Sequence, residues 1–106
     1  MGYAKERGKL EKLLTKIVGI NIYEEKSLAT LTDSHEKYSH TVRILKNKEP
    51  EIFGDLYKNE LQEVKNSKTA LKESDSDEAR QNNFIVYKDS IVNALEKTIN
   101  TTKETL

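Results

Sequence analysis

The sequence predicts an all-α protein, an antiparallel helical bundle in which one shorter helix is followed by three long helices. Apolar residues return at helical spacing along most of the chain, and no two strand-like runs are available to pair. Apolar residues make up 35% of the chain and charged residues 34%, so each helix buries only a narrow stripe. The length of 106 residues predicts a single domain, residues 1–106.

The first helix is predicted from Tyr3 to Val18, because Gly19 is a typical helix end. Its apolar face consists of Leu10, Leu13, Leu14 and Ile17. The next four residues are too few for a strand with a partner. We expect them to form an apolar connector packed on the bundle, made of Ile20, Asn21, Ile22 and Tyr23.

The second helix is predicted from Tyr23 to Asn47. Its buried stripe recurs at steps of three and four residues, which places the side chains on one helical face. This helix–helix interface consists of Leu28, Leu31, His35, Tyr38, Val42 and Leu45. Asp33 and Glu36 fit a capping box, so a break near Leu31 is an alternative to a continuous helix.

The third helix is predicted from Pro50 to about Glu73, because proline suits the first turn of a helix. An acidic turn follows, in which Ser74 or Asp75 is expected to cap the next helix. The fourth helix is predicted from Asp75 to about Thr105. It contains β-branched runs, but a lone strand would have no partner and a helix is therefore favoured.

Charge and composition exclude several classes of function. Eighteen basic and eighteen acidic residues cancel, so binding of nucleic acid by bulk charge is not expected. The absence of cysteine excludes disulfides and thiolate chemistry. No apolar run is long enough for a membrane span or a signal peptide, so we expect a soluble, cytoplasmic protein.

The sequence offers no catalytic or cofactor site. Asp33, Ser34 and His35 are adjacent on one helix and point in different directions, so they cannot form a triad. Glu36 and His40 are spaced like metal ligands, but two ligands on a charged face are far from a site, and exposed neighbours are the favoured interpretation. We therefore expect no enzyme, no metal and no cofactor.

His35 lies on the buried stripe, where an apolar residue is expected. The favoured interpretation is a core histidine that is satisfied by hydrogen bonding and fixes helix register. A pH-sensitive interface residue is the second interpretation, because burial would move its titration. A catalytic base is the third.

The strongest local feature is a basic stripe on the first helix. Its lysines are spaced four, three and four residues apart, away from the apolar face, and are Lys5, Lys9, Lys12 and Lys16. The stripe suits an anionic membrane surface or an acidic partner. Lysines are also common on solvated helix faces, which is the ordinary explanation, and Glu6 and Glu11 dilute the charge.

The run from Tyr3 to Glu11, YAKERGKLE, resembles the start of F-BAR membrane-curving domains, whose early helix often reads aromatic, basic, Glu-Arg, small, then aliphatic-Glu. This resemblance covers about a tenth of the chain and implies a membrane surface as partner. Helical hairpins of the type VII export class have similar length but carry a Trp-x-Gly turn, and this chain has no Trp. Small cytosolic immunity proteins are also lysine-rich four-helix bundles, so an inhibitor-type function is a further alternative.

The sequence therefore predicts a non-enzymatic protein–protein interaction module that self-associates. Thin helices with narrow apolar stripes are expected to leave apolar residues available to a second chain. The candidates are Leu28, Leu45, Ile52, Phe53 and Phe84. The alternative is a peripheral binder that uses the basic stripe on an anionic membrane or an acidic partner.

Overall fold

The computed structural model describes residues 3–104, which form helices joined by short connections and contain no strand. The first two helices are α1 (Ala4–Ile17) and α2 (Glu25–Lys48). A continuous helical stretch then comprises α3 (Pro50–Asp55), the π-helical turn η1 (Leu56–Glu60) and α4 (Leu61–Lys72). The last helix is α5 (Asp77–Glu104). The prediction of an all-helical fold is confirmed.

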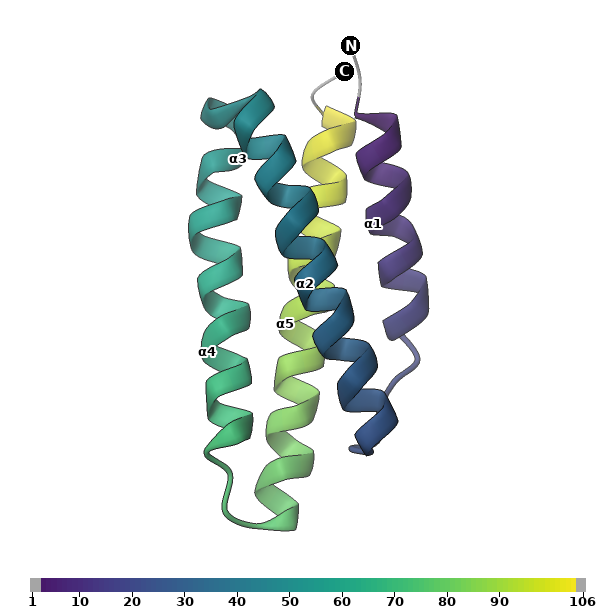
Figure 1. The fold of residues 1–106 in the computed structure, drawn as a ribbon, viewed down its shortest axis with the longest axis vertical. Helices are drawn as coiled ribbons and strands as arrows, with labels where there is room; N and C mark the ends of the chain where they lie inside the picture. The colour runs from purple at the N-terminus through teal and green to yellow at the C-terminus, as the bar shows by residue number, and fades with distance from the viewer. Residues whose placement is uncertain (1–2, 105–106) are drawn as a thin grey trace.

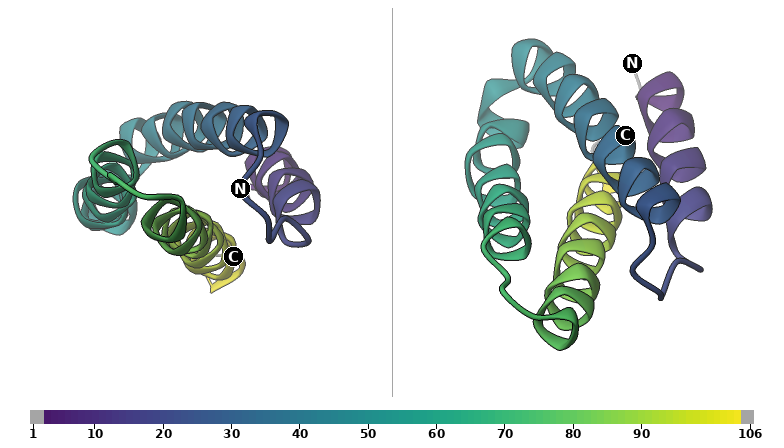
Figure 2. Two further views of the ribbon diagram at one scale, coloured as in Figure 1. Left: turned by 90° about the horizontal axis from the view of Figure 1, so that it is seen from below. Right: turned by 60° about the horizontal axis from the view of Figure 1, so that its bottom comes forward.

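Helix α5 is the central element, because α1, α2, η1 and α4 all contact it. Figure 1 shows α5 between α4 and α1 with α2 crossing over it, and Figure 2 shows the other helices as an arc around it. The molecule is elongated, with extents of 47 × 23 × 17 Å. With neighbours on several sides, α5 buries a wider stripe than a helix at the edge.

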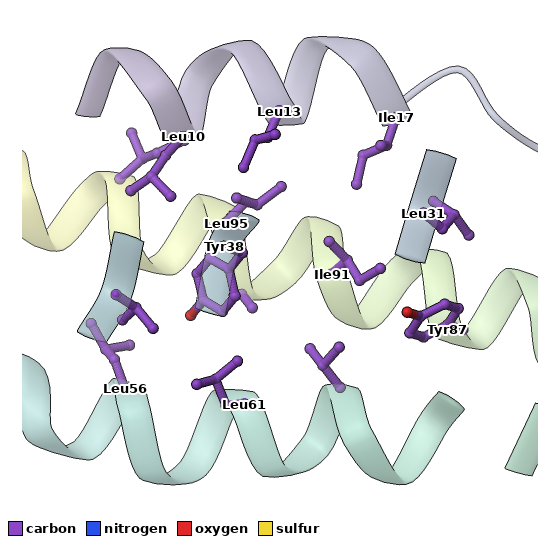
Figure 3. Packing of buried hydrophobic residues seen from close by; sticks show 14 of the residues in the cluster. Leu10, Leu13, Ile17, Leu31, Tyr38, Leu56, Leu61, Tyr87, Ile91 and Leu95 are labelled. Atoms are coloured by element: carbon purple, nitrogen blue, oxygen red, sulfur yellow. The ribbon is translucent and has the colours of Figure 1, made fainter. Parts of the chain in front are cut away.

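One hydrophobic cluster joins all the helices. Figure 3 shows Leu13 and Ile17 of α1 directed toward Ile91 and Leu95 of α5, with Leu61 approaching from α4. On α2, most of the predicted stripe is buried, namely Leu31, His35, Tyr38, Val42 and Leu45, and Leu28 is half-buried. The partners of this stripe are therefore other helices of the same chain.

The apolar residues expected to remain available to a second chain are mostly inside the molecule. Leu45, Phe53 and Phe84 are fully buried and Leu28 is half-buried, so the expectation is wrong for these residues. Phe53 packs edge-on against Tyr3, with ring centroids 5.2 Å apart, because α3 folds back over the end of the bundle. Of the five candidates, Ile52 alone is exposed, at 37%.

The connector between α1 and α2 is also different from the prediction. Ile20 packs against the core, but Ile22 is 65% exposed and Tyr23 is 36% exposed. Polar bonds to α5 hold the connector instead: Gln81 donates its Nε2–H to the Asn21 carbonyl at 2.9 Å and accepts the Tyr23 N–H at 2.8 Å. The Tyr23 ring also meets the buried Phe84 ring edge to face, with centroids 5.5 Å apart, so Ile22 is the apolar side chain of the connector that the core leaves exposed.

Helix α2 runs unbroken through Thr32, so the alternative of a break near Leu31 is wrong. Asp33 forms an ion pair with Lys37 at 3.0 Å, one turn further along the same helix, instead of capping a new helix.

The cap of α5 is a different residue from the predicted Ser74 or Asp75. The Ser76 hydroxyl accepts the Ala79 N–H at 3.1 Å, so Ser76 is the N-cap and the helix begins at Asp77. The predicted end near Thr105 lies outside the described residues.

Candidate functional site

The adjacent polar residues considered as a triad, Asp33, Ser34 and His35, lie in different environments on α2. Asp33 pairs with Lys37 at the surface, and His35 lies in the core. The Ser34 hydroxyl is buried and has no hydrogen-bond partner among residues 3–104. These side chains therefore cannot act together on a substrate.

His35 is a core residue with a polar partner on α5. Its Nδ1 lies 3.0 Å from the Tyr87 hydroxyl, and the two rings meet edge to face. Burial, together with the nearby charges of Lys68 and Lys65, lowers the pKa of His35 to about 4. Burial raises the pKa of Tyr87 to about 12. The pair is thus held neutral at neutral pH, as expected for a core histidine satisfied by hydrogen bonding.

Glu36 and His40 both lie at the surface and line the same groove. Within the described part of the chain, no group of three or more histidine, cysteine or carboxylate side chains is arranged to hold a metal ion. Asp33 also lines this groove, whereas His35 is turned away from it into the core. The groove is therefore better described by its charges than by any ligand set.

The lysines of the basic stripe are all exposed. None of Lys5, Lys9, Lys12 and Lys16 lies within ion-pair distance of a carboxylate belonging to residues 3–104. Glu6, which was expected to dilute the stripe, is buried and pairs with Lys48 at 3.6 Å. Glu11 lies on the other side of α1, in a recess shared with α5. The stripe therefore has more unbalanced charge than the sequence indicates.

Three of the four stripe lysines form one wall of a groove between α1 and α2. This groove has a volume of about 610 Å³, and the α1 wall consists of Lys9, Lys12 and Lys16 with Leu13 beside them. The α2 wall is mixed in charge and consists of Asp33, Glu36, Lys37, His40 and Thr41. We call this feature the α1–α2 groove. It is the strongest candidate site that includes residues singled out in the sequence.

The sequence pattern identifies the lysine wall but not the groove. The spacing of Lys9, Lys12 and Lys16 is readable in the sequence because all three lie on one helix. The α2 wall has no such signal, since its distance from the lysines depends on how the two helices pack. Lys37 and Thr41 were missed for this reason.

Comparison with known proteins gives no guide to the function of this site: no family model matches the chain, and neither does any curated protein or solved structure. Within residues 3–104, no helix combines the length and the apolar character that crossing a membrane requires.

Proposed function

We propose that the protein is an antiparallel helical bundle that acts as a non-enzymatic protein interaction module, and that its α1–α2 groove binds an acidic segment of a partner protein. The observation that carries this proposal is the row of lysines on α1, which are exposed and lack carboxylate partners among residues 3–104. Unpaired cations beside a recess attract carboxylates and speed their encounter.

The chemistry of the groove favours a segment with both acidic and apolar residues. Lys9, Lys12 and Lys16 span about two helical turns, which matches the spacing of carboxylates on one face of a helix. The aliphatic parts of these lysine side chains offer apolar contacts, whereas Leu13 at the base of the groove is only 7% exposed and packs into the core (Figure 3). An amphipathic helix can satisfy both, in the manner of helix-in-groove recognition.

The α2 wall favours a protein segment over a flat anionic membrane, which is the alternative target of the basic stripe. Glu36 and Asp33 stand opposite the lysines, and a planar layer of anionic headgroups would meet these carboxylates as well. A peptide can place its acidic residues against α1 and keep them away from Glu36. A partner therefore has to match both the shape of the groove and the arrangement of charges on its two walls, which makes binding specific.

Self-association has less support, because most of the apolar residues expected to mediate it are buried in the chain's own core. The large apolar residues that are exposed lie in three places, with Val18, Ile22 and Tyr23 at the connector, Ile52 on α3 and Val86 on α5. Scattered exposed apolar residues of this kind are normal on a protein surface.

The test is a binding titration with an acidic amphipathic peptide of about 15 residues, long enough to form a helix when bound. The triple variant Lys9→Gln, Lys12→Gln and Lys16→Gln should bind at least about tenfold more weakly, since each exposed ion pair contributes a fraction of a kcal/mol. Fluorescence anisotropy at low and moderate salt measures both the affinity and its expected decrease with ionic strength.

The matched control removes the same net charge elsewhere, by Lys26→Gln, Lys72→Gln and Lys103→Gln, at exposed lysines outside the groove. It should keep the wild-type affinity within about twofold. Equal loss in both triple variants would mean that only bulk charge matters and would contradict the groove. Stronger binding to anionic vesicles than to the peptide would contradict a protein partner and favour a membrane surface as the target of the basic stripe.

A further inference from the structure

A second recess lies where α2 meets the π-helical turn and α4. It has a volume of about 280 Å³, and its polar lining consists of Ser39, Arg43, Tyr57, Lys58, Gln62 and Lys65. We call it the η1 pocket. Helical spacing places Ser39 and Arg43 on the opposite flank of α2 from Asp33 and Lys37, so this pocket is separate from the α1–α2 groove.

The η1 pocket collects positive charge without a counterion. Three of its lining residues are cationic and none is acidic. None of Arg43, Lys58 and Lys65 forms an ion pair with a carboxylate of residues 3–104. Glu60 is close in sequence to Tyr57 and Lys58, but its carboxylate is paired with Lys97 of α5 at 2.8 Å, outside the pocket. Like charges held together cost stability, and such clusters are typical of anion sites.

Tyr57 is the centre of this cationic cluster. The Lys46 Nζ lies 4.3 Å from the centroid of its ring. A hydrogen bond with Arg43 and the charge of Arg43 lower the pKa of Tyr57, and Lys46 and Lys65 lower it further, against the opposing effect of burial. The hydroxyl of Tyr57 therefore lies in a strongly positive environment.

The backbone at Tyr57 is unusual as well. Tyr57 and Lys58 belong to η1, the π-helical turn in the otherwise α-helical stretch from Pro50 to Lys72. π turns in α-helices are rare and frequently occur at functional sites, because the wider turn directs side chains differently from an α turn. Here the turn directs two residues into the same pocket as Arg43.

We propose that the η1 pocket binds the phosphate group of a phosphorylated ligand. Arg43, Lys58 and Lys65 supply the positive charge. The hydroxyls of Ser39 and Tyr57 supply neutral donors.

Phosphate fits this donor set better than a carboxylate does. A phosphate monoester carries up to two negative charges and three terminal oxygens, so donors on several sides can engage it at once. The guanidinium of Arg43 can bond two of these oxygens in parallel. The pocket is smaller than the roughly 300–1,000 Å³ typical of sites that enclose an organic ligand, which suits the phosphate head alone.

The first test is an NMR titration of the whole chain with inorganic phosphate, in which chloride is exchanged for phosphate at constant ionic strength. We expect saturable shifts in the amide signals of Arg43, Tyr57 and Lys58. The variant Arg43→Gln with Lys65→Gln should lower the affinity at least about tenfold, and Tyr57→Phe about fivefold, as expected for the loss of charged and neutral donors respectively.

The matched control is Lys26→Gln with Lys103→Gln, which removes two positive charges at exposed lysines outside both the η1 pocket and the α1–α2 groove and should keep the phosphate affinity within about twofold. Thermal unfolding without phosphate separates binding from folding. The Arg43→Gln, Lys65→Gln variant should melt at the same temperature as the wild type or higher, because it relieves repulsion between like charges. Shifts that do not saturate, or that persist in this variant, would overturn the proposal.

The phosphate group can belong to a soluble molecule or to a lipid headgroup, and vesicle sedimentation distinguishes these sources. Vesicles that contain phosphatidylinositol bisphosphate are compared with phosphatidylserine vesicles of equal charge. Retention on the former alone, lost in Arg43→Gln with Lys65→Gln, supports a headgroup. Saturable phosphate binding without retention on either vesicle supports a soluble ligand. Equal retention on both vesicles without saturable phosphate binding would overturn the proposal, and so would the absence of all binding.

Discussion

His35 places a titratable side chain in the core, where it is 7% exposed. Its hydrogen bond with Tyr87 connects α2 to α5 and satisfies one nitrogen of the ring. Protonation would leave a charge in an apolar environment that already faces the positive charges of Lys65 and Lys68. The folded state therefore favours the neutral ring.

The pH dependence of stability follows from this preference. The folded-state pKa of about 4 is below the ordinary value of 6.5, so the unfolded chain takes up the proton first as pH falls. The contribution of neutral His35 is thus fully present above about pH 6.5 and is lost as pH falls toward 4, by on the order of 3 kcal/mol. Urea unfolding between pH 4 and 7 should show this loss in the wild type.

The variant His35→Gln removes the titrating group and should have a flatter pH profile over the same range, although it is less stable at pH 7. Since carboxylates also titrate near pH 4, the difference between the two profiles isolates His35. His40→Gln is the matched control for removal of an exposed imidazole. Parallel profiles for the wild type and His35→Gln would contradict the lowered pKa.

At the scale of the element, the π turn explains an irregular spacing of buried residues. Phe53, Leu56, Leu61 and Val64 are all buried, at steps of three, five and three residues. A step of five would turn Leu61 away from Leu56 in a regular α-helix, whereas the i to i+5 bonding of a π turn keeps both on one side. The turn thus accommodates one extra residue without changing which side of the helix faces the core.

Deletion of Asn59 should therefore be tolerated. Asn59 is exposed and lies in η1 but does not line the η1 pocket, so its loss converts the step of five into a regular step of four. We expect the free energy of unfolding to change by no more than about 1 kcal/mol. Phosphate binding should weaken, because Tyr57 and Lys58 are redirected. Urea unfolding and the phosphate titration measure the two effects.

Deletion of Glu63, which is exposed in the regular part of α4, is the matched control. It rotates the residues on either side of the deletion by about 100° relative to each other and should destabilise the protein severely. If the two deletions were equally harmful, the π turn would not be an insertion that the helix absorbs.

The extent to which the sequence predicts each element depends on whether its signal is local. The spacing of Leu31, His35 and Tyr38 is enough to predict α2 and its buried face, because a helix repeats within itself. The step of five residues from Leu56 to Leu61 is present in the sequence, but π turns are rare, so the pattern predicts a regular helix from Pro50 to about Glu73. The η1 pocket has no such signal, since its residues come from three elements and meet only after packing.

At the scale of the whole molecule, the hydrophobic core is a single cluster to which every helix contributes. Helix α1 packs mainly on α2 and α5 and forms one wall of the α1–α2 groove. Arg7 also holds α1 to the C-terminal end of α5, where its Nε–H donates to the Thr102 hydroxyl at 3.1 Å. Since Leu10 and other apolar residues of α1 are fully buried, separating α1 from the other helices would expose part of the common core.

A single core predicts a single cooperative unfolding transition. Leu10→Ala in α1 and Leu61→Ala in α4 should each cost about 2–5 kcal/mol, a large part of the roughly 5–15 kcal/mol that stabilises a domain. Both variants should shift one urea transition, with the same midpoint by circular dichroism and by tyrosine fluorescence. Val86→Ala is the control, because Val86 is 53% exposed and should change stability by about 0.5 kcal/mol or less. An early, separate transition in Leu10→Ala would mean that α1 folds onto an independent three-helix unit, and the α1–α2 groove would then exist only while α1 is docked.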